Sequence, residues 1–219
     1  MKPTLLLIAA GIAGSALLAN VWAHEGHNHA AQAQRSVDPT GLAQQDRQPR
    51  SEREWGQYQR SLQVYVVPDV VMVNANARPI RIRELLASDG PLMLNFISAH
   101  CATNCSELHR QFAMVPEKLG APAAKLRMVS VSIHAEDDVP RQLKALAAQF
   151  SAGKNWQFIT GSIEDIEAMQ RAFDSYDFNK SEIKPSIFLR PVAGKPWVRI
   201  NGLASAEDLA REYRNLIQN

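Results

Sequence analysis

Two cysteines, Cys101 and Cys105, are the residues of this sequence best suited to chemistry, and they are the only two that it contains. They follow the apolar run Leu92–Ile97 and have three residues between them. This spacing brings two sulfurs to one side of a helix start, where two thiolates can bind Cu(I) and a nearby imidazole would extend the site to Cu(II). The same pair can form and break a disulfide. The sequence therefore predicts a copper site, a redox pair, or both.

A purely structural disulfide between Cys101 and Cys105 is the simplest alternative, because disulfides are common in exported proteins. A bridge that closes only three intervening residues removes little entropy from the unfolded chain, so it would stabilise the fold poorly. A metal-binding or redox role therefore explains the cysteine pair better than a structural disulfide does.

Three histidines lie near the cysteines or near the predicted sheet edge. His100 directly precedes the first cysteine, where it either lowers a thiolate pKa and binds metal or is simply exposed. His134 follows a predicted buried strand at residues 126–133, and the carboxyl ends of central strands face the functional crevice of such sheets. We expect His134 to be a metal ligand or a loop histidine paired with Asp137. His109, four residues after the second cysteine, is expected to be a solvated helix histidine.

A further three of the six histidines, His24, His27 and His29, lie close together near the N-terminus. Short His-rich tracts can bind Cu(II) or Zn(II), and cleavage after Ala23 would add the free amine of His24 to the ligands. The alternative is a polar tail whose histidines are incidental.

The N-terminus has the features of an export signal. Lys2 supplies a positive charge, residues 4–19 are apolar, and residues 21–23 resemble a cleavage site. Residues 1–23 are therefore predicted to be a signal peptide or, if uncleaved, a membrane anchor, which places the protein in a periplasm, soluble or tethered to the inner membrane.

Composition predicts one soluble domain after this segment. The chain has 219 residues, of which 46% are hydrophobic and 21% charged, and its net charge of +2 argues against a nucleic-acid partner. Residues 24–60 lack apolar periodicity and are predicted to be a flexible linker, with the domain at residues 61–219.

Strand and helix patterns alternate along that domain. Strands are expected at residues 64–67, 70–73, 92–97, 126–133, 156–160, 186–189 and 197–200, and helices at residues 82–87, 105–119, 140–150, 163–173 and 206–217. Ser162 and Ser205 are placed to cap the last two helices, and Pro116 is expected to kink or end the second. The order predicts an α/β sandwich with a central mixed sheet flanked by helices.

Several segments, taken in order, resemble the Sco/SenC family. They are residues 66–70 with Asn74, the run 92–97 leading into Cys-x-x-x-Cys, residues 128–133, residues 150–161 and residues 196–202. The resemblance covers roughly residues 62–217. It implies a thioredoxin-like fold, a copper site that includes Cys101 and Cys105, and a role in delivering copper to cytochrome c oxidase or in reducing the cysteines that will hold that copper.

The chain departs from the family pattern at the third copper ligand. Ile183 stands where the family has a distal histidine, and no histidine follows His134. Copper binding is therefore conditional on a substitute, for which His134 and His100 are the candidates. His134 itself replaces the first acidic residue of a family segment that spans residues 132–140.

Two hypotheses follow. In the first, the protein carries copper to a periplasmic cuproenzyme subunit or exchanges it with another copper carrier. In the second, it is a thiol–disulfide oxidoreductase in which Cys101 attacks and Cys105 resolves, and its partner is a thiol or disulfide of a periplasmic protein. A peroxidase is a third, weaker hypothesis, for which no particular residue argues.

Overall fold

The computed structural model describes residues 56–87, 89–100, 104–176 and 185–218, and for residues 104–106 it describes the backbone alone. The elements, in chain order, are β1 (Gln57–Gln63), β2 (Val71–Asn74), β3 (Pro79–Arg81), α1 (Ile82–Leu86), β4 (Leu92–Ile97), α2 (Asn104–Leu119), the 3-10 helix η1 (Ala121–Lys125), β5 (Arg127–Ser132), α3 (Pro140–Gln149), β6 (Trp156–Thr160), α4 (Ile163–Ala172), β7 (Ser186–Arg190), β8 (Trp197–Leu203) and α5 (Ala206–Gln218).

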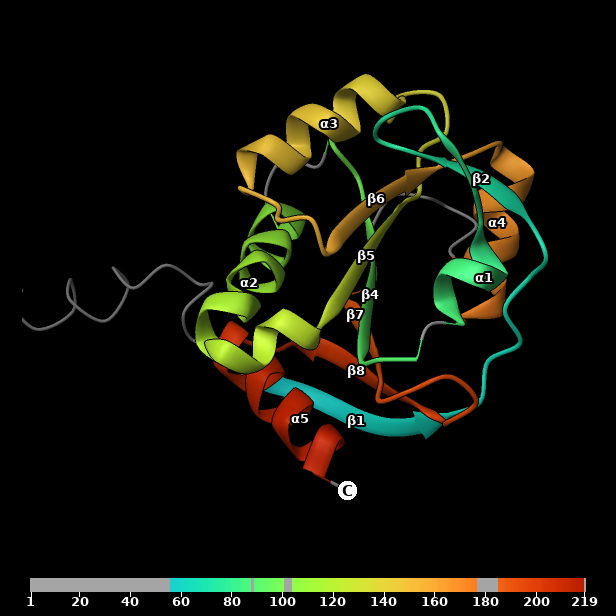
Figure 1. The fold of residues 1–219 in the computed structure, drawn as a ribbon. Coiled ribbons are helices and arrows are strands. Elements are labelled where there is room, and N and C mark those ends of the chain that lie inside the picture. The colour runs from blue at the N-terminus through green and yellow to red at the C-terminus, as the bar shows by residue number, and fades with distance from the viewer. Residues whose placement is uncertain (1–55, 88, 101–103, 177–184, 219) are drawn as a thin grey trace, which may run out of the picture. The chain divides into compact units, whose positions relative to one another are not determined.

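One mixed sheet holds the described domain together. Its strand order is β1-β8-β7-β4-β5-β6-β2-β3, with β4, β5 and β6 parallel and their neighbours antiparallel. Helices α2, α3 and α5 cover one face, and α1 and α4 cover the other (Figure 1). This arrangement confirms the predicted α/β sandwich with a mixed central sheet.

Burial of β4 on both faces explains why its residues are apolar except for Asn95, whose side-chain oxygen accepts the Ser130 hydroxyl at 2.6 Å. All six of its residues are buried. Met93 and Ile97 pack beneath α2 and α5, whereas Leu92, Leu94 and Phe96 pack against α1 and α4. A strand covered on both sides places every side chain in a core, so polar alternation disappears.

Local signals set the helix ends as predicted. The Ser162 hydroxyl accepts the Asp165 N–H at 3.2 Å and caps α4. At α5, Ser205 Oγ accepts the Asp208 N–H at 3.1 Å and the Asp208 carboxylate accepts the Ser205 N–H at 3.1 Å, which is a reciprocal capping box. Helix α2 continues through Pro116 to Leu119 rather than ending at the proline.

The strand predicted at residues 64–67 is wrong. These residues form no strand, and Val64 and Val66 are 82% exposed. The sheet instead gains β1, which starts at Gln57 inside the predicted linker and pairs antiparallel with β8. Polar side chains also tie β1 to α5: Tyr58 and Arg60 donate to the buried Glu212 carboxylate at 2.9 and 3.0 Å. Long-range pairing therefore outweighed the β-propensity of the valines.

The parts of the chain that the structure describes hold no helix long and apolar enough to cross a membrane. The predicted leader at residues 1–23 lies outside them.

Candidate functional site

The predicted cysteine loop lies between a central strand and a helix. Strand β4 ends at Ile97 and α2 begins at Asn104, so Cys105 belongs to the first turn of α2. Cys101 and the side chain of Cys105 lie outside the described residues, as does Ile183. What the structure does describe is how the chain immediately before Cys101 is held.

A buried carboxylate, that of Asp138, holds this part of the chain. Asp138 has 0% of its surface exposed and lies in the loop between β5 and α3. Its carboxylate accepts the Ala99 N–H at 3.1 and 3.2 Å and the Ser132 hydroxyl at 2.6 Å. Buried carboxylates need such donors, because an ionised group without partners is costly to remove from water. Asp138 therefore ties the end of β4 to the end of β5.

His100 joins the same carboxylate. Its Nδ1 lies 3.3 Å from Asp138 Oδ1, while its side chain remains 57% exposed. A carboxylate partner on one ring nitrogen favours the tautomer with the proton there, which leaves the lone pair of Nε2 free for a metal. This is the arrangement that orients histidine ligands in metal sites, and it occurs here one residue before Cys101.

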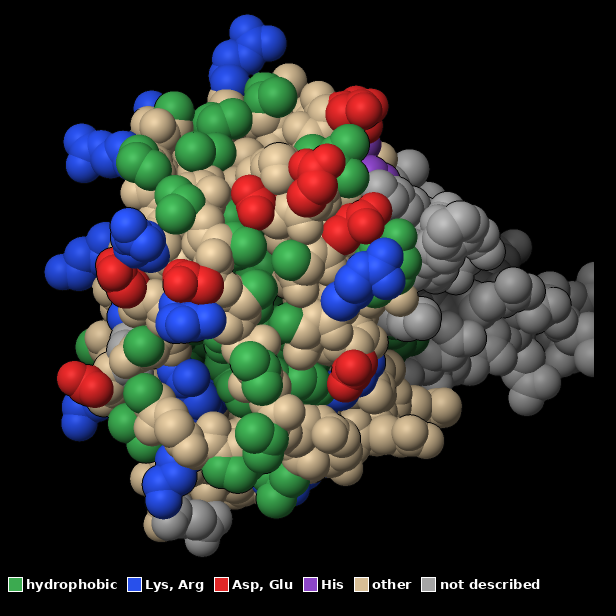
Figure 2. Space-filling model, turned by 90° about the vertical axis from the view of Figure 1, so that its right-hand side faces the viewer, with side chains coloured by type: hydrophobic (Ala, Val, Ile, Leu, Met, Phe, Trp, Pro, Cys, Tyr) green, Lys and Arg blue, Asp and Glu red, His purple; other side chains and the backbone are tan. Residues whose placement is uncertain are grey.

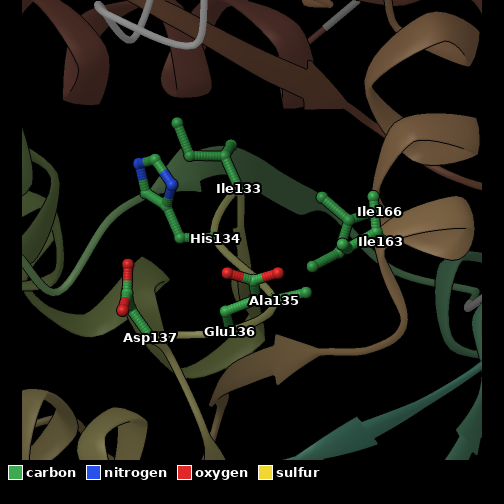
Figure 3. Close-up of a pocket in the computed structure, with 7 residues that line it drawn as sticks. All are labelled: Ile133, His134, Ala135, Glu136, Asp137, Ile163 and Ile166. Carbon is green, nitrogen blue, oxygen red and sulfur yellow. The ribbon is translucent and has the colours of Figure 1, made fainter.

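His134 lies in the same loop as Asp138, four residues before it. Its backbone N–H donates to Ser132 Oγ at 3.0 Å, and its carbonyl accepts the Asp138 N–H at 2.9 Å. The half-buried ring lines a surface hollow together with Glu136 and Asp137 (Figure 3). Of these two candidate metal ligands, His100 is the one that has a carboxylate partner on its ring among the described residues.

The prediction that His109 is a solvated helix histidine is wrong. Its side chain is 3% exposed and packs edge-on against Phe150, with ring centroids 6.2 Å apart. Its Nε2 is buried without a hydrogen-bond partner in the structure. Burial lowers the pKa of His109 to about 4, because the charged form would lose its hydration. The ring is therefore neutral at pH 7.

Among the described residues, no group of three or more His, Cys, Asp or Glu side chains is placed to hold a metal ion. His134, Glu136 and Asp137 therefore form no ligand cluster of their own. The tail histidines His24, His27 and His29 lie outside the described residues, and their metal binding stays a prediction.

Sequence reasoning missed Asp138. Asp138 is the last of three consecutive acidic residues in the segment 132–140, and its place in the chain alone does not show that it is buried. Ser132 and Asp138 bracket the loop and bond to each other, so a Ser and an Asp six residues apart after a buried strand were the available signal.

Comparison with known proteins decides the family. A family model described as SCO1/SenC matches residues 65–216. The chain belongs to the SCO1/SenC family. A SCO1 protein homolog of Bacillus subtilis (strain 168) is 35% identical over 77 residues, which are 34% of this chain and 40% of that protein. The match therefore spans about two fifths of that relative's length.

Solved SCO1/SenC structures share the fold of the chain. BsSco, described as having a disulfide switch and as a member of the Sco family of cytochrome c oxidase assembly proteins, has a TM-score of 0.60 at 23% identity, covering 72% of this chain and 96% of its own. The copper-bound ScoI of Bradyrhizobium japonicum has a TM-score of 0.56 at 16% identity, covering 69% and 99%. These likenesses confirm the predicted thioredoxin-like fold.

Proposed function

We propose that this protein is an exported assembly factor that carries copper to a periplasmic cuproenzyme, for which cytochrome c oxidase is the expected recipient. Membership of the SCO1/SenC family supports the copper-assembly class. The observation that carries the proposal for this chain is the Asp138–His100 pair, because it presents an imidazole with a free Nε2 directly before Cys101. Residues 1–23 support export, with a soluble or a tethered product.

The cysteine pair would hold the copper as cargo. Cys105 lies in the first turn of α2, where unpaired N–H groups and the helix dipole favour a thiolate. Two thiolates suit Cu(I), and the Nε2 of His100 would add the nitrogen that Cu(II) prefers. Asp138 would keep that ring in place, so the residues present fit copper even though Ile183 replaces the usual distal ligand.

A thiol–disulfide oxidoreductase is the second candidate function, and it is favoured by the replacement at Ile183, which leaves the cysteines untouched. The Cys101 thiolate would attack a target disulfide and form a mixed disulfide, and one target sulfur would leave as a thiolate and take a proton. The Cys105 thiolate would then displace the second target sulfur. The target is reduced to a dithiol, this pair is oxidised to a disulfide, and an external dithiol would restore it.

Anaerobic Cu(I) titration tests the copper function. The native chain should bind one Cu(I) with an affinity at least about 100-fold above that of the Cys101→Ser/Cys105→Ser variant, because serine hydroxyls are poor Cu(I) ligands. Circular dichroism of both proteins controls for folding. Equal affinities would contradict copper carriage. A mixed disulfide that accumulates with a periplasmic protein in Cys105→Ser alone would then favour the oxidoreductase.

Replacing His100 with alanine should weaken Cu(II) binding by about 10- to 100-fold and leave Cu(I) binding nearly unchanged, because only Cu(II) needs the imidazole nitrogen. Electron paramagnetic resonance of the Cu(II) complex reports whether a nitrogen ligand is lost. His134→Ala is the matched control. If His134→Ala removes the nitrogen signal and His100→Ala does not, the assignment of His100 is wrong.

A further inference from the structure

A surface hollow lies where the loop after β5 meets the start of α4. Its volume is about 170 Å³, and it is lined by Ile133, His134, Ala135, Glu136, Asp137, Ile163 and Ile166. Figure 3 shows Ile163 and Ile166 on α4 facing the loop that carries the other five.

The hollow is small, and its lining combines isoleucine side chains with polar ones. Ile133 and Ile166 are buried at its base, and Ile163 at its edge is 38% exposed. Pockets for cofactors and drug-sized molecules are larger, roughly 300–1,000 Å³. The space therefore suits one apolar side chain better than a whole small molecule, and an exposed isoleucine beside it would lose water when such a side chain binds.

The edge of the hollow is acidic. Glu136 and Asp137 line it, and Glu164 follows Ile163 in the first turn of α4. Among the described residues, none of these three carboxylates forms an ion pair with a Lys or Arg. Figure 2 shows that acidic side chains lie beside hydrophobic ones on the face of the molecule that it draws. Acidic groups without ion-pair partners beside these isoleucines are complementary to an apolar side chain flanked by basic ones.

The loop that lines the hollow is linked by hydrogen bonds to the chain that precedes Cys101. The His134 carbonyl accepts the Asp138 N–H at 2.9 Å, and the Asp138 carboxylate accepts the Ala99 N–H at 3.1 Å. A molecule seated in the hollow would thus contact the loop that also holds residues 99 and 100.

We propose that the hollow is a docking site for a polypeptide segment of the partner protein, in which one aliphatic side chain enters the hollow and neighbouring Lys or Arg side chains meet Glu136, Asp137 and Glu164. That the docked protein is the recipient of copper or electrons rests on the proposed function. The docking itself depends on the hollow alone and does not require the cysteines.

Peptide titration followed by amide chemical shifts of the folded chain tests the site. The probe is acetyl-Gly-Arg-Leu-Lys-Gly-amide, and the comparison peptides replace Leu by Ala or replace both basic residues by Glu. We expect the probe to bind with a Kd on the order of 1 mM, with shifts concentrated at residues 133–137 and 163–166. The Ala peptide should bind at least about fivefold more weakly, because it loses most of the buried apolar area. The Glu peptide should give no shifts there.

Charge variants separate this docking from general attraction to acidic surface. Glu136→Gln/Asp137→Asn should weaken the probe several-fold and reduce its salt dependence. Asp89→Asn/Glu117→Gln, which removes the same charge from exposed positions elsewhere, should change nothing. Equal loss in both variants, equal binding of the Leu and Ala peptides, or shifts outside the hollow would overturn the proposal.

Two further titrations separate peptide docking from cation binding and from the proposed copper function. If Cu(II) alone shifts the hollow residues and the probe does not, the hollow binds cations and the docking proposal is wrong. The Cys101→Ser/Cys105→Ser variant should bind the probe as the native chain does. Docking in that variant together with failed copper titration would show that the proposed function is wrong while the docking site stands.

Discussion

Replacing Asp138 with alanine should lower the free energy of unfolding by about 3 kcal/mol, because buried donors left without an acceptor cost about 1–3 kcal/mol each. The carboxylate is the acceptor for the Ala99 N–H and for the Ser132 hydroxyl, and Asp138 is 0% exposed. Urea denaturation at pH 7 measures the change. The same variant should also weaken Cu(II) binding by about 10- to 100-fold, since His100 loses the group that orients its ring.

The conservative variant Asp138→Asn separates shape from charge. Its amide oxygen can still accept one hydrogen bond, so the loss of stability should be clearly smaller than in the alanine variant. Asp137→Ala, at the exposed neighbouring position, is the matched control and should stay within about 0.5 kcal/mol of the native chain. A stability loss in Asp138→Ala no larger than in Asp137→Ala would show that the carboxylate does not hold the end of β4.

The second large predicted effect is a loss of folding stability at acidic pH, caused by His109. His109 has a pKa of about 4 in the folded chain, against an ordinary value of 6.5, because its ring is buried. Between these two values the unfolded chain binds a proton that the folded chain does not, so stability falls as the pH drops from 6.5 towards 4. The difference of pKa corresponds to a loss of about 3 kcal/mol.

Replacing His109 with leucine or with glutamine should remove this acid sensitivity. Unfolding free energies are compared at pH 7 and pH 4.5, where the native chain should lose about 2–3 kcal/mol more than either variant. Other groups titrate alike in all three proteins, so the difference between them isolates His109. Leucine tests an apolar replacement and glutamine a polar one that does not titrate. An equal acid loss in all three proteins would contradict a buried neutral imidazole.

The sequence predicted most of the sheet correctly where local patterns coincide with burial. Five of the six residues of strand β4 are apolar and all six are buried, as expected for a strand covered on both faces, and the observed bounds match the predicted ones. Ser162 and Ser205 set the starts of α4 and α5 because capping depends on residues three apart in the chain. Such information is local, so it can be taken from the sequence.

Two of the failures were long-range. The valines at 64 and 66 favour a strand by propensity, yet they are exposed and β1 forms the edge of the sheet instead. Side chains of β1 bond to Glu212, more than 150 residues away in the sequence. His109 has an ordinary position on a helix surface in the sequence, but α3 ends beside it and buries it against Phe150. Propensity does not say which neighbour will cover a residue.

By itself, the sequence determined the cysteine pair, its position between an apolar strand and a helix, and the family pattern around it. Only the tertiary structure decided which histidine meets a carboxylate. Asp138 lies 38 residues after His100 in the chain, and the parallel pairing of β4 with β5 places the loops after both strands at the same edge of the sheet. The contact follows from that pairing, because the carboxyl ends of parallel neighbouring strands lie together however far apart they are in the sequence.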